Sequence, residues 1–225
     1  MNYQDDIASM FTLAHELGHS LHSELAKDEQ PWQYADYTIF VAEVASTVNE
    51  TLLTHHLLET VEDDALRMHV LDEYLERFRQ TLFRQTMFAD FELRIHEIAE
   101  ADGALTPDRF DEEYRDLKSE FYAPAELDDR IDREWMRIPH FYYNYYVYQY
   151  ATGISAAVAI VERILEEGED VASAYREALA LGGSEYPIDV LDAAGVDMTT
   201  SEPIESAISV YDEYLDRMAA LLSAA

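Results

Sequence analysis

Two histidines four residues apart, with a glutamate directly after the first, stand near the start of the sequence in "FTLAHELGHSLHSE", residues 11–24. Residues i and i+4 lie on one face of an α-helix, so the imidazoles of His15 and His19 can bind the same ion. Glu16 stands beside the first ligand, where its carboxylate can reach a water molecule at the metal. The spacing H-E-x-x-H predicts a tetrahedral zinc site with one position open to water. The alternative is a solvated helix face that carries two histidines by accident.

The residues around this motif favour a packed helix. Apolar residues flank both histidines, and Gly18 lies within a run of otherwise good helix formers. A glycine inside a helix costs about 1 kcal/mol relative to alanine, so we expect another element to approach closely there. His22 continues the same run and is a weaker candidate ligand.

A catalytic zinc needs a third protein ligand from another segment, and Glu43 in "FVAEVASTVNE" is the best candidate. Apolar residues on both sides of Glu43 predict that its carboxylate is buried, and a buried carboxylate must be paired or bind a metal. Glu50 lies two helical turns further along the same face. Glu50 is an alternative ligand, a solvated residue, or a partner for the N–H of a ligand imidazole, and we favour the last.

A second stretch with chemical potential is "IPHFYYNYYVYQYATG", residues 138–153, in which His140 precedes six tyrosines. Most of these tyrosines are explained as packing residues of a buried helix whose hydroxyls find partners. Peptide hydrolysis, however, builds negative charge on the carbonyl oxygen, and a histidine or phenol aimed at that oxygen can stabilise it. His140 follows a proline near an expected helix start, so we expect it to project into a cleft.

The segments that must position these residues have helical periodicity, with few glycines and prolines to interrupt it. Thr106 and Pro107 suit a helix N-cap followed by a first-turn proline. One helix is expected to begin near Asp63 and to continue to residue 100 with one break. Further helices are expected at 7–26, 38–60, from 107 to before Pro124, 140–166, 170–181, 187–194 and 202–223. No strand-like alternation occurs, so the sequence predicts an all-α fold in a single domain over residues 1–225.

The charge is strongly negative, with 47 acidic against 15 basic residues and a net charge of −32. Such a surface repels nucleic-acid phosphates and anionic lipid, so we expect no nucleic-acid or membrane partner. We favour the interpretation that the acidic residues solvate the protein in a high-salt, halophilic cytoplasm, where ions screen their repulsion. The alternative is an acidic field that selects substrates. The absence of cysteine, signal peptide and long apolar stretch also favours a cytoplasmic protein.

Five blocks together resemble the oligoendopeptidase F branch of the thimet oligopeptidase-like zinc metallopeptidases. They are "NYQDDIASMFTLAHELGHSLHS", "FVAEVASTVNETLL", "FRQTMFADFE", "IPHFYYNYYVYQYATG" and "LGGSEYPIDVLDAAGVDM". They occur in the family's order and cover nearly the whole chain. The resemblance implies a multi-helix zincin-type catalytic domain, a zinc cofactor, and cleavage of short peptides inside a channel.

The resemblance also implies roles for single residues. His15, His19 and Glu43 match the family's zinc ligands, and Glu16 matches its general base. His140 matches a histidine that contacts substrate. The tyrosines that stabilise the transition state match Tyr150 and, less closely, Tyr143, while Tyr146 and Tyr148 are rivals because the tyrosine run leaves the register ambiguous.

One departure from the family leads to a second hypothesis. Full-length relatives carry several hundred residues before the H-E-x-x-H helix, whereas this motif begins at residue 15. The chain resembles the C-terminal catalytic part, and the face left by the missing region is expected to favour association. The first hypothesis is a zinc-dependent endopeptidase of short oligopeptides. The second is a catalytically silent zinc-binding fragment or interaction protein that needs a partner N-terminal half. A di-iron bundle would need Glu-x-x-His pairs on two helices, and only the cluster Glu92–His96–Glu97 comes close.

Overall fold

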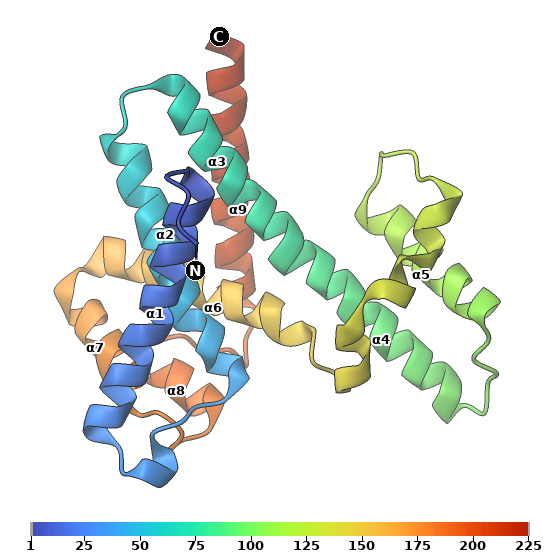
Figure 1. Ribbon diagram of the computed structural model, residues 1–225, viewed down its shortest axis with the longest axis horizontal. Helices are drawn as coiled ribbons and strands as arrows, with labels where there is room; N and C mark the ends of the chain where they lie inside the picture. Colours follow the sequence, from blue (N-terminus) through green and yellow to red (C-terminus); the bar gives the residue numbers. More distant parts are fainter. Residues whose placement is uncertain (1, 225) are drawn as a thin grey trace. The chain divides into compact units, whose positions relative to one another are not determined.

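The computed structural model describes residues 2–224, and every regular element in that range is helical (Figure 1). The prediction of an all-α fold is confirmed. The chain divides into two compact units, of which the second is Arg79–Ala151 and the first comprises Met1–Phe78 together with Thr152–Ala225. That residues 1–225 act as one catalytic domain stays a prediction.

The first unit contains the helices that carry the H-E-x-x-H motif and Glu43. The side chain of Asp6 accepts a hydrogen bond from the backbone N–H of Ser9 at 2.7 Å and so caps the first helix. The helices of this unit are α1 (Ile7–Glu29), the short 3₁₀ turn η1 (Trp32–Tyr34), α2 (Ile39–Thr60), α3 (Asp64–Phe78), α6 (Tyr148–Glu167, which begins in the second unit), α7 (Glu169–Ala180), α8 (Pro187–Ala193) and α9 (Glu202–Ala224).

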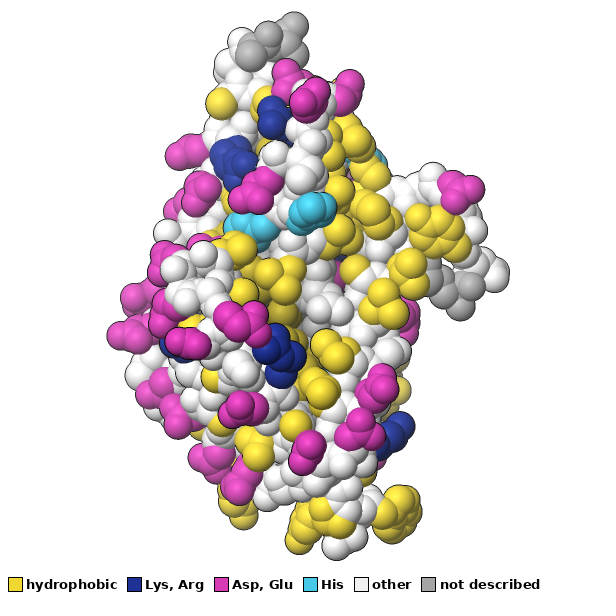
Figure 2. All heavy atoms as spheres, turned by 90° about the vertical axis from the view of Figure 1, so that its left-hand side faces the viewer, with side chains coloured by type: hydrophobic (Ala, Val, Ile, Leu, Met, Phe, Trp, Pro, Cys, Tyr) yellow, Lys and Arg dark blue, Asp and Glu magenta, His cyan; other side chains and the backbone are white. Residues whose placement is uncertain are grey.

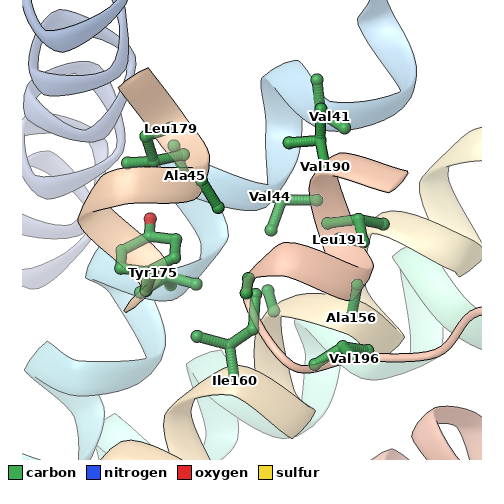
Figure 3. Packing of buried hydrophobic residues seen from close by; sticks show 14 of the residues in the cluster. Val41, Val44, Ala45, Ala156, Ile160, Tyr175, Leu179, Val190, Leu191 and Val196 are labelled. Carbon is green, nitrogen blue, oxygen red and sulfur yellow. The ribbon is translucent and has the colours of Figure 1, made fainter. Parts of the chain in front are cut away.

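The core of the first unit is built around α2. Val44 and Ala45 of α2 are buried against Ile160 of α6, Leu179 of α7 and Leu191 of α8 (Figure 3). Each fully buried aliphatic side chain contributes roughly 1.5–3 kcal/mol relative to an exposed one. The helix with the proposed third ligand is therefore fixed from several sides by apolar packing.

The second unit is a smaller cluster of helices around an aromatic core. Thr106 caps α5 through its side chain and Pro107 stands at the first position, as the sequence predicted. The core residues are Met87, Phe88, Phe91, Tyr114, Leu117, Ile138 and Val147. The elements are the π-helix η2 (Arg79–Phe83), α4 (Arg84–Glu100), α5 (Pro107–Phe121) and the 3₁₀ segments η3 (Asp129–Arg137) and η4 (Pro139–Tyr143).

The structure locates the break in one predicted helix and corrects the start of another. The break expected within residues 63–100 is the π-helix Arg79–Phe83. The helix expected over 140–166 is wrong in its first part, because α6 begins only at Tyr148. Asn144 and Tyr145 have φ angles of 49° and 58°, a left-handed conformation that a right-handed helix cannot contain.

Figure 2 shows acidic side chains scattered over the face it displays, with few basic side chains between them. This distribution agrees with the net charge of −32. None of the helices within residues 2–224 combines the length and the apolar character needed to cross a bilayer.

Candidate metal centre

The candidate metal centre lies where α1 and α2 pack closely together. A Cβ atom built on Gly18 would lie 2.5 Å from Cα of Ser46 and 2.6 Å from the carbonyl oxygen of Ala45. The close approach expected at Gly18 is confirmed. The side-chain amide of Asn49 adds a polar contact, since its Nδ2 donates to the carbonyl oxygen of Ala14 at 3.2 Å. The two helices are thereby held in one register.

Three potential ligand atoms converge where these helices meet. The Nε2 atoms of His15 and His19 are 3.1 Å apart, and Oε2 of Glu43 lies 3.5 Å and 3.8 Å from them, respectively. All three atoms lie within 4.8 Å of one another. Two atoms bound at 2.0–2.1 Å to a tetrahedral zinc ion lie about 3.3 Å apart. Donor types and spacing therefore fit zinc with one position left open.

Outer contacts orient these ligands. Oε1 of the buried Glu50 lies 3.5 Å from Nδ1 of His15, and the other carboxylate oxygen of Glu50 pairs with Arg77. A carboxylate at Nδ1 favours the tautomer that carries its proton there, which leaves the Nε2 lone pair of His15 free to bind a metal. The hydroxyl of Ser46 lies 3.4 Å from Oε2 of Glu43 and donates to the Glu43 carbonyl oxygen at 2.9 Å.

The site is electrically negative. The hydrogen bond to Glu50 is the largest cause that raises the pKa of His15, burial opposes it, and the charges of Glu50, Glu43 and Glu16 raise it further. Glu43 itself is half-buried, with 30% of its side chain exposed, so the expectation of a buried carboxylate is wrong. The partial exposure leaves the ligand atoms within reach of solvent.

Glu16 lies on the exposed side of α1. Together with His19 it lines an open hollow of about 480 Å³, to which Ser20, Ser23 and Glu24 also contribute. A carboxylate in this position is in contact with solvent water beside the ligand group, which suits the exchange of protons.

His22, the weaker candidate ligand, is not part of the ligand group. Its ring is fully buried and stacks on Tyr37 at 3.5 Å between ring centroids, and neither ring nitrogen has a hydrogen-bond partner among the described residues. Burial, and less strongly the charge of His19, lowers the pKa of His22 to about 4. A neutral, stacked imidazole of this kind is a packing residue.

The histidine and tyrosines proposed to contact substrate form a separate cluster in the second unit. The ring centroids of Tyr143, Tyr146 and Tyr150 lie 6.1, 5.5 and 5.9 Å from that of His140. The hydroxyl of Tyr150 donates to that of Tyr146 at 3.2 Å. Tyr146, a rival in the sequence, thus joins His140, Tyr143 and Tyr150. The expectation that most of the six tyrosines are buried packing residues is wrong, because Tyr142, Tyr143, Tyr145 and Tyr148 are exposed, at 88%, 61%, 38% and 43%.

Two contacts are not visible in the sequence pattern, the ion pair of Arg77 and the hydrogen bond of Glu92 to the backbone. Arg77 pairs with Glu50 across two helices, and no spacing in the sequence connects them. The sequence singles out Glu92 only through the di-iron alternative, yet its carboxylate is buried and accepts a hydrogen bond from the backbone N–H of Tyr145. An acid directly after Phe91 and one helical turn after Phe88 is the signal that could identify it, because both phenylalanines are expected to be buried.

Several known proteins have sequences similar to that of this chain. Residues 1–210 match the model of peptidase family M3. Oligopeptidase PepF of Bacillus subtilis (strain 168) is 51% identical over 99% of this chain, which covers 33% of that protein. Group B oligopeptidase PepB of Streptococcus agalactiae is 46% identical over 96% of this chain, which covers 36% of that protein.

A solved structure gives the same result for the fold. The crystal structure of oligoendopeptidase-F from Enterococcus faecium superposes with a TM-score of 0.88 and 44% identity, over 97% of this chain and 40% of that one. The chain thus spans about a third of the length of the curated relatives it matches. Sequence and fold agree, and the chain belongs to peptidase family M3.

Proposed function

We propose that this chain is the catalytic part of a zinc-dependent endopeptidase that hydrolyses peptide bonds in short oligopeptides. The observation that carries the proposal is the convergence of His15, His19 and Glu43 within 4.8 Å of one another. The names of the relatives PepF and PepB, both oligopeptidases, support the substrate class. Because the chain covers about a third of those proteins, its own activity is part of the proposal.

In this proposal His15, His19 and Glu43 hold the zinc ion, and Glu50 keeps the His15 ring in the tautomer that binds. When bound, zinc would polarise the scissile carbonyl and acidify a water molecule. Glu16 accepts a proton from the attacking water and passes it to the departing amine.

The aromatic cluster of the second unit has the complementary role. We infer that His140 and Tyr150, with Tyr143, donate hydrogen bonds to the carbonyl oxygen as its negative charge develops. The resemblance to oligoendopeptidase F supports this role, and so does the clustering of the rings around His140.

The decisive variant is Glu16→Gln, which keeps the size of the side chain and removes the proton acceptor. We expect loss of hydrolysis of quenched fluorescent peptides with zinc content unchanged. Glu24→Gln is the matched control, because Glu24 lines the same hollow on the same helix and has no role in the chemistry. Retained turnover in Glu16→Gln would refute the assignment of the general base.

Metal binding is tested separately from turnover. His19→Phe should abolish stoichiometric zinc binding, whereas His22→Phe, a change of the same kind one turn along α1, should leave it intact. Peptides of several lengths, assayed with and without a chelator, then distinguish an active enzyme from a silent fragment. Bound zinc without chelator-sensitive cleavage would favour the silent fragment.

A further inference from the structure

The turn between η4 and α6 has an unusual backbone. Asn144 and Tyr145 are consecutive residues with positive φ, of 49° and 58°. Asparagine tolerates this conformation, but tyrosine rarely adopts it because its Cβ crowds the backbone. Such a conformation persists only where the surrounding structure determines it, so other contacts must hold the turn.

Glu92 on α4 supplies the most direct of these contacts. Its carboxylate oxygen Oε1 accepts the backbone N–H of Tyr145 at 2.6 Å. Glu92 is 1% exposed, and no salt bridge to it is found within residues 2–224. Burial of a carboxylate without a cation is costly unless hydrogen bonds compensate. The carboxylate is therefore committed to the backbone of the turn.

A second contact from the same helix fixes the side chain of Tyr145. The ring of His96 lies 4.5 Å from the ring of Tyr145 between centroids, and Nδ1 of His96 is 2.7 Å from the carbonyl oxygen of Glu92. Glu92 and His96 are one helical turn apart. Together they hold both the backbone and the side chain of Tyr145.

The residues on either side of the turn pack on α4 as well. Phe141 lies 5.5 Å from Phe88 and 5.3 Å from Phe91 between ring centroids. Val147 is fully buried in the core cluster that contains both of these phenylalanines. Apolar packing thus seats both ends of the segment, and the hydrogen bond to Glu92 sets the path of the chain between them.

This path brings the rings together. His140 and Tyr143 precede the turn, whereas Tyr146 and Tyr150 follow it. The three tyrosine rings lie within 6.1 Å of the His140 ring between centroids. We propose that Glu92 is a positioning residue, whose buried carboxylate locks the turn at Tyr145 and thereby assembles the cluster of His140 and tyrosines that acts on the substrate carbonyl. This inference rests on the proposed function of that cluster.

The test compares Glu92→Leu with Glu92→Gln in the full chain. Leucine keeps the buried volume and removes the acceptor, whereas glutamine keeps an acceptor oxygen. In Glu92→Leu we expect the Tyr145 amide to exchange with deuterium at least about tenfold faster. We also expect kcat to fall about tenfold or more, with KM and zinc content nearly unchanged. Glu92→Gln should retain most of the exchange protection and of kcat.

Leu117→Ala is the control for a loss of stability alone. Leu117 is fully buried in the same core, and its apolar side chain takes no part in the hydrogen bond that holds the turn. This variant should lower the unfolding temperature without selectively speeding the deuterium exchange of the Tyr145 amide. Unchanged exchange in Glu92→Leu, or faster exchange with unchanged kcat, would overturn the inference. If the unmodified chain cleaves no peptide, the proposed function fails, and the exchange data still decide whether Glu92 locks the turn.

Discussion

Gly18 on α1 lies against the backbone of Ser46 on α2, so closely that a Cβ on the glycine would come within 2.5 Å of the serine Cα. The contact is with backbone, which cannot rotate away, so Gly18→Ala must push the helices apart. Overpacking of this kind costs about 1–3 kcal/mol. We expect this loss in urea denaturation, together with weaker zinc binding because His19 and Glu43 separate.

Gly153 on α6 provides the matched control for the Gly18 variant. Apart from its own helix, the one atom of the described residues that a Cβ there would meet within 4 Å is the Cβ of Glu43, at an ordinary 3.9 Å. Because alanine is favoured over glycine in a helix by about 1 kcal/mol, Gly153→Ala should be neutral or stabilising. Equal effects of the two substitutions would show that the close contact at Gly18 does not control stability.

Glu50 contacts the His15 ring on the side away from Nε2, the proposed metal-binding atom, with Oε1 at 3.5 Å from the imidazole Nδ1. Glu50→Gln removes the charge that favours the binding tautomer. Loss of such an outer partner typically lowers metal affinity about 10–100-fold. Competition with a chromogenic chelator should show this decrease, whereas Glu59→Gln, the same change at an exposed position of α2, should not. Unchanged zinc affinity in Glu50→Gln would remove Glu50 from the site.

Part of the candidate ligand group could be predicted from the sequence because helical geometry links the two histidines. The spacing of His15 and His19 fixes them on one face. Apolar neighbours single out Glu43, but the burial that they predict is wrong, since 30% of its side chain is exposed. The pairing of Glu50 with Arg77 could not be predicted in this way, because it depends on how α2 and α3 pack. Local pattern determines which residues share a face, and tertiary packing determines what that face meets.

The same limit explains the error over residues 140–147. Six tyrosines with helical spacing read as a continuous helix, but the structure has a 3₁₀ turn followed by two left-handed residues. The stabilising contact comes from Glu92, far away in the sequence, through a hydrogen bond to the backbone of Tyr145. A side chain that recognises backbone leaves no periodic pattern, so tertiary contact overrides helix propensity here.

The net charge of −32 predicts a strong dependence of stability on salt. At low ionic strength the acidic side chains repel one another and destabilise the compact state. The screening length falls from about 30 Å at 0.01 M to about 8 Å at 0.15 M salt. We expect the Tm to rise by several degrees, roughly 1 kcal/mol or more, between these concentrations of KCl. A Tm that does not change, or that falls, would show that the charges are too dispersed to matter.

Glu134 in the second unit predicts how stability depends on pH. Burial opposes ionisation of its carboxyl, but hydrogen bonds from Lys118 and Tyr114 and the charges of Lys118 and Arg84 outweigh it and lower the pKa to about 2. In the unfolded chain the carboxyl of Glu134 has its ordinary pKa near 4.5, so it binds a proton more readily there than in the folded protein. Ionised Glu134 therefore adds about 3 kcal/mol to the free energy of unfolding. This contribution is fully present above pH 4.5 and is lost as the pH falls toward 2. Urea unfolding of the parent chain and of Glu134→Gln should show a large difference at pH 7 that shrinks by pH 3. An equal difference at both pH values would contradict the lowered pKa.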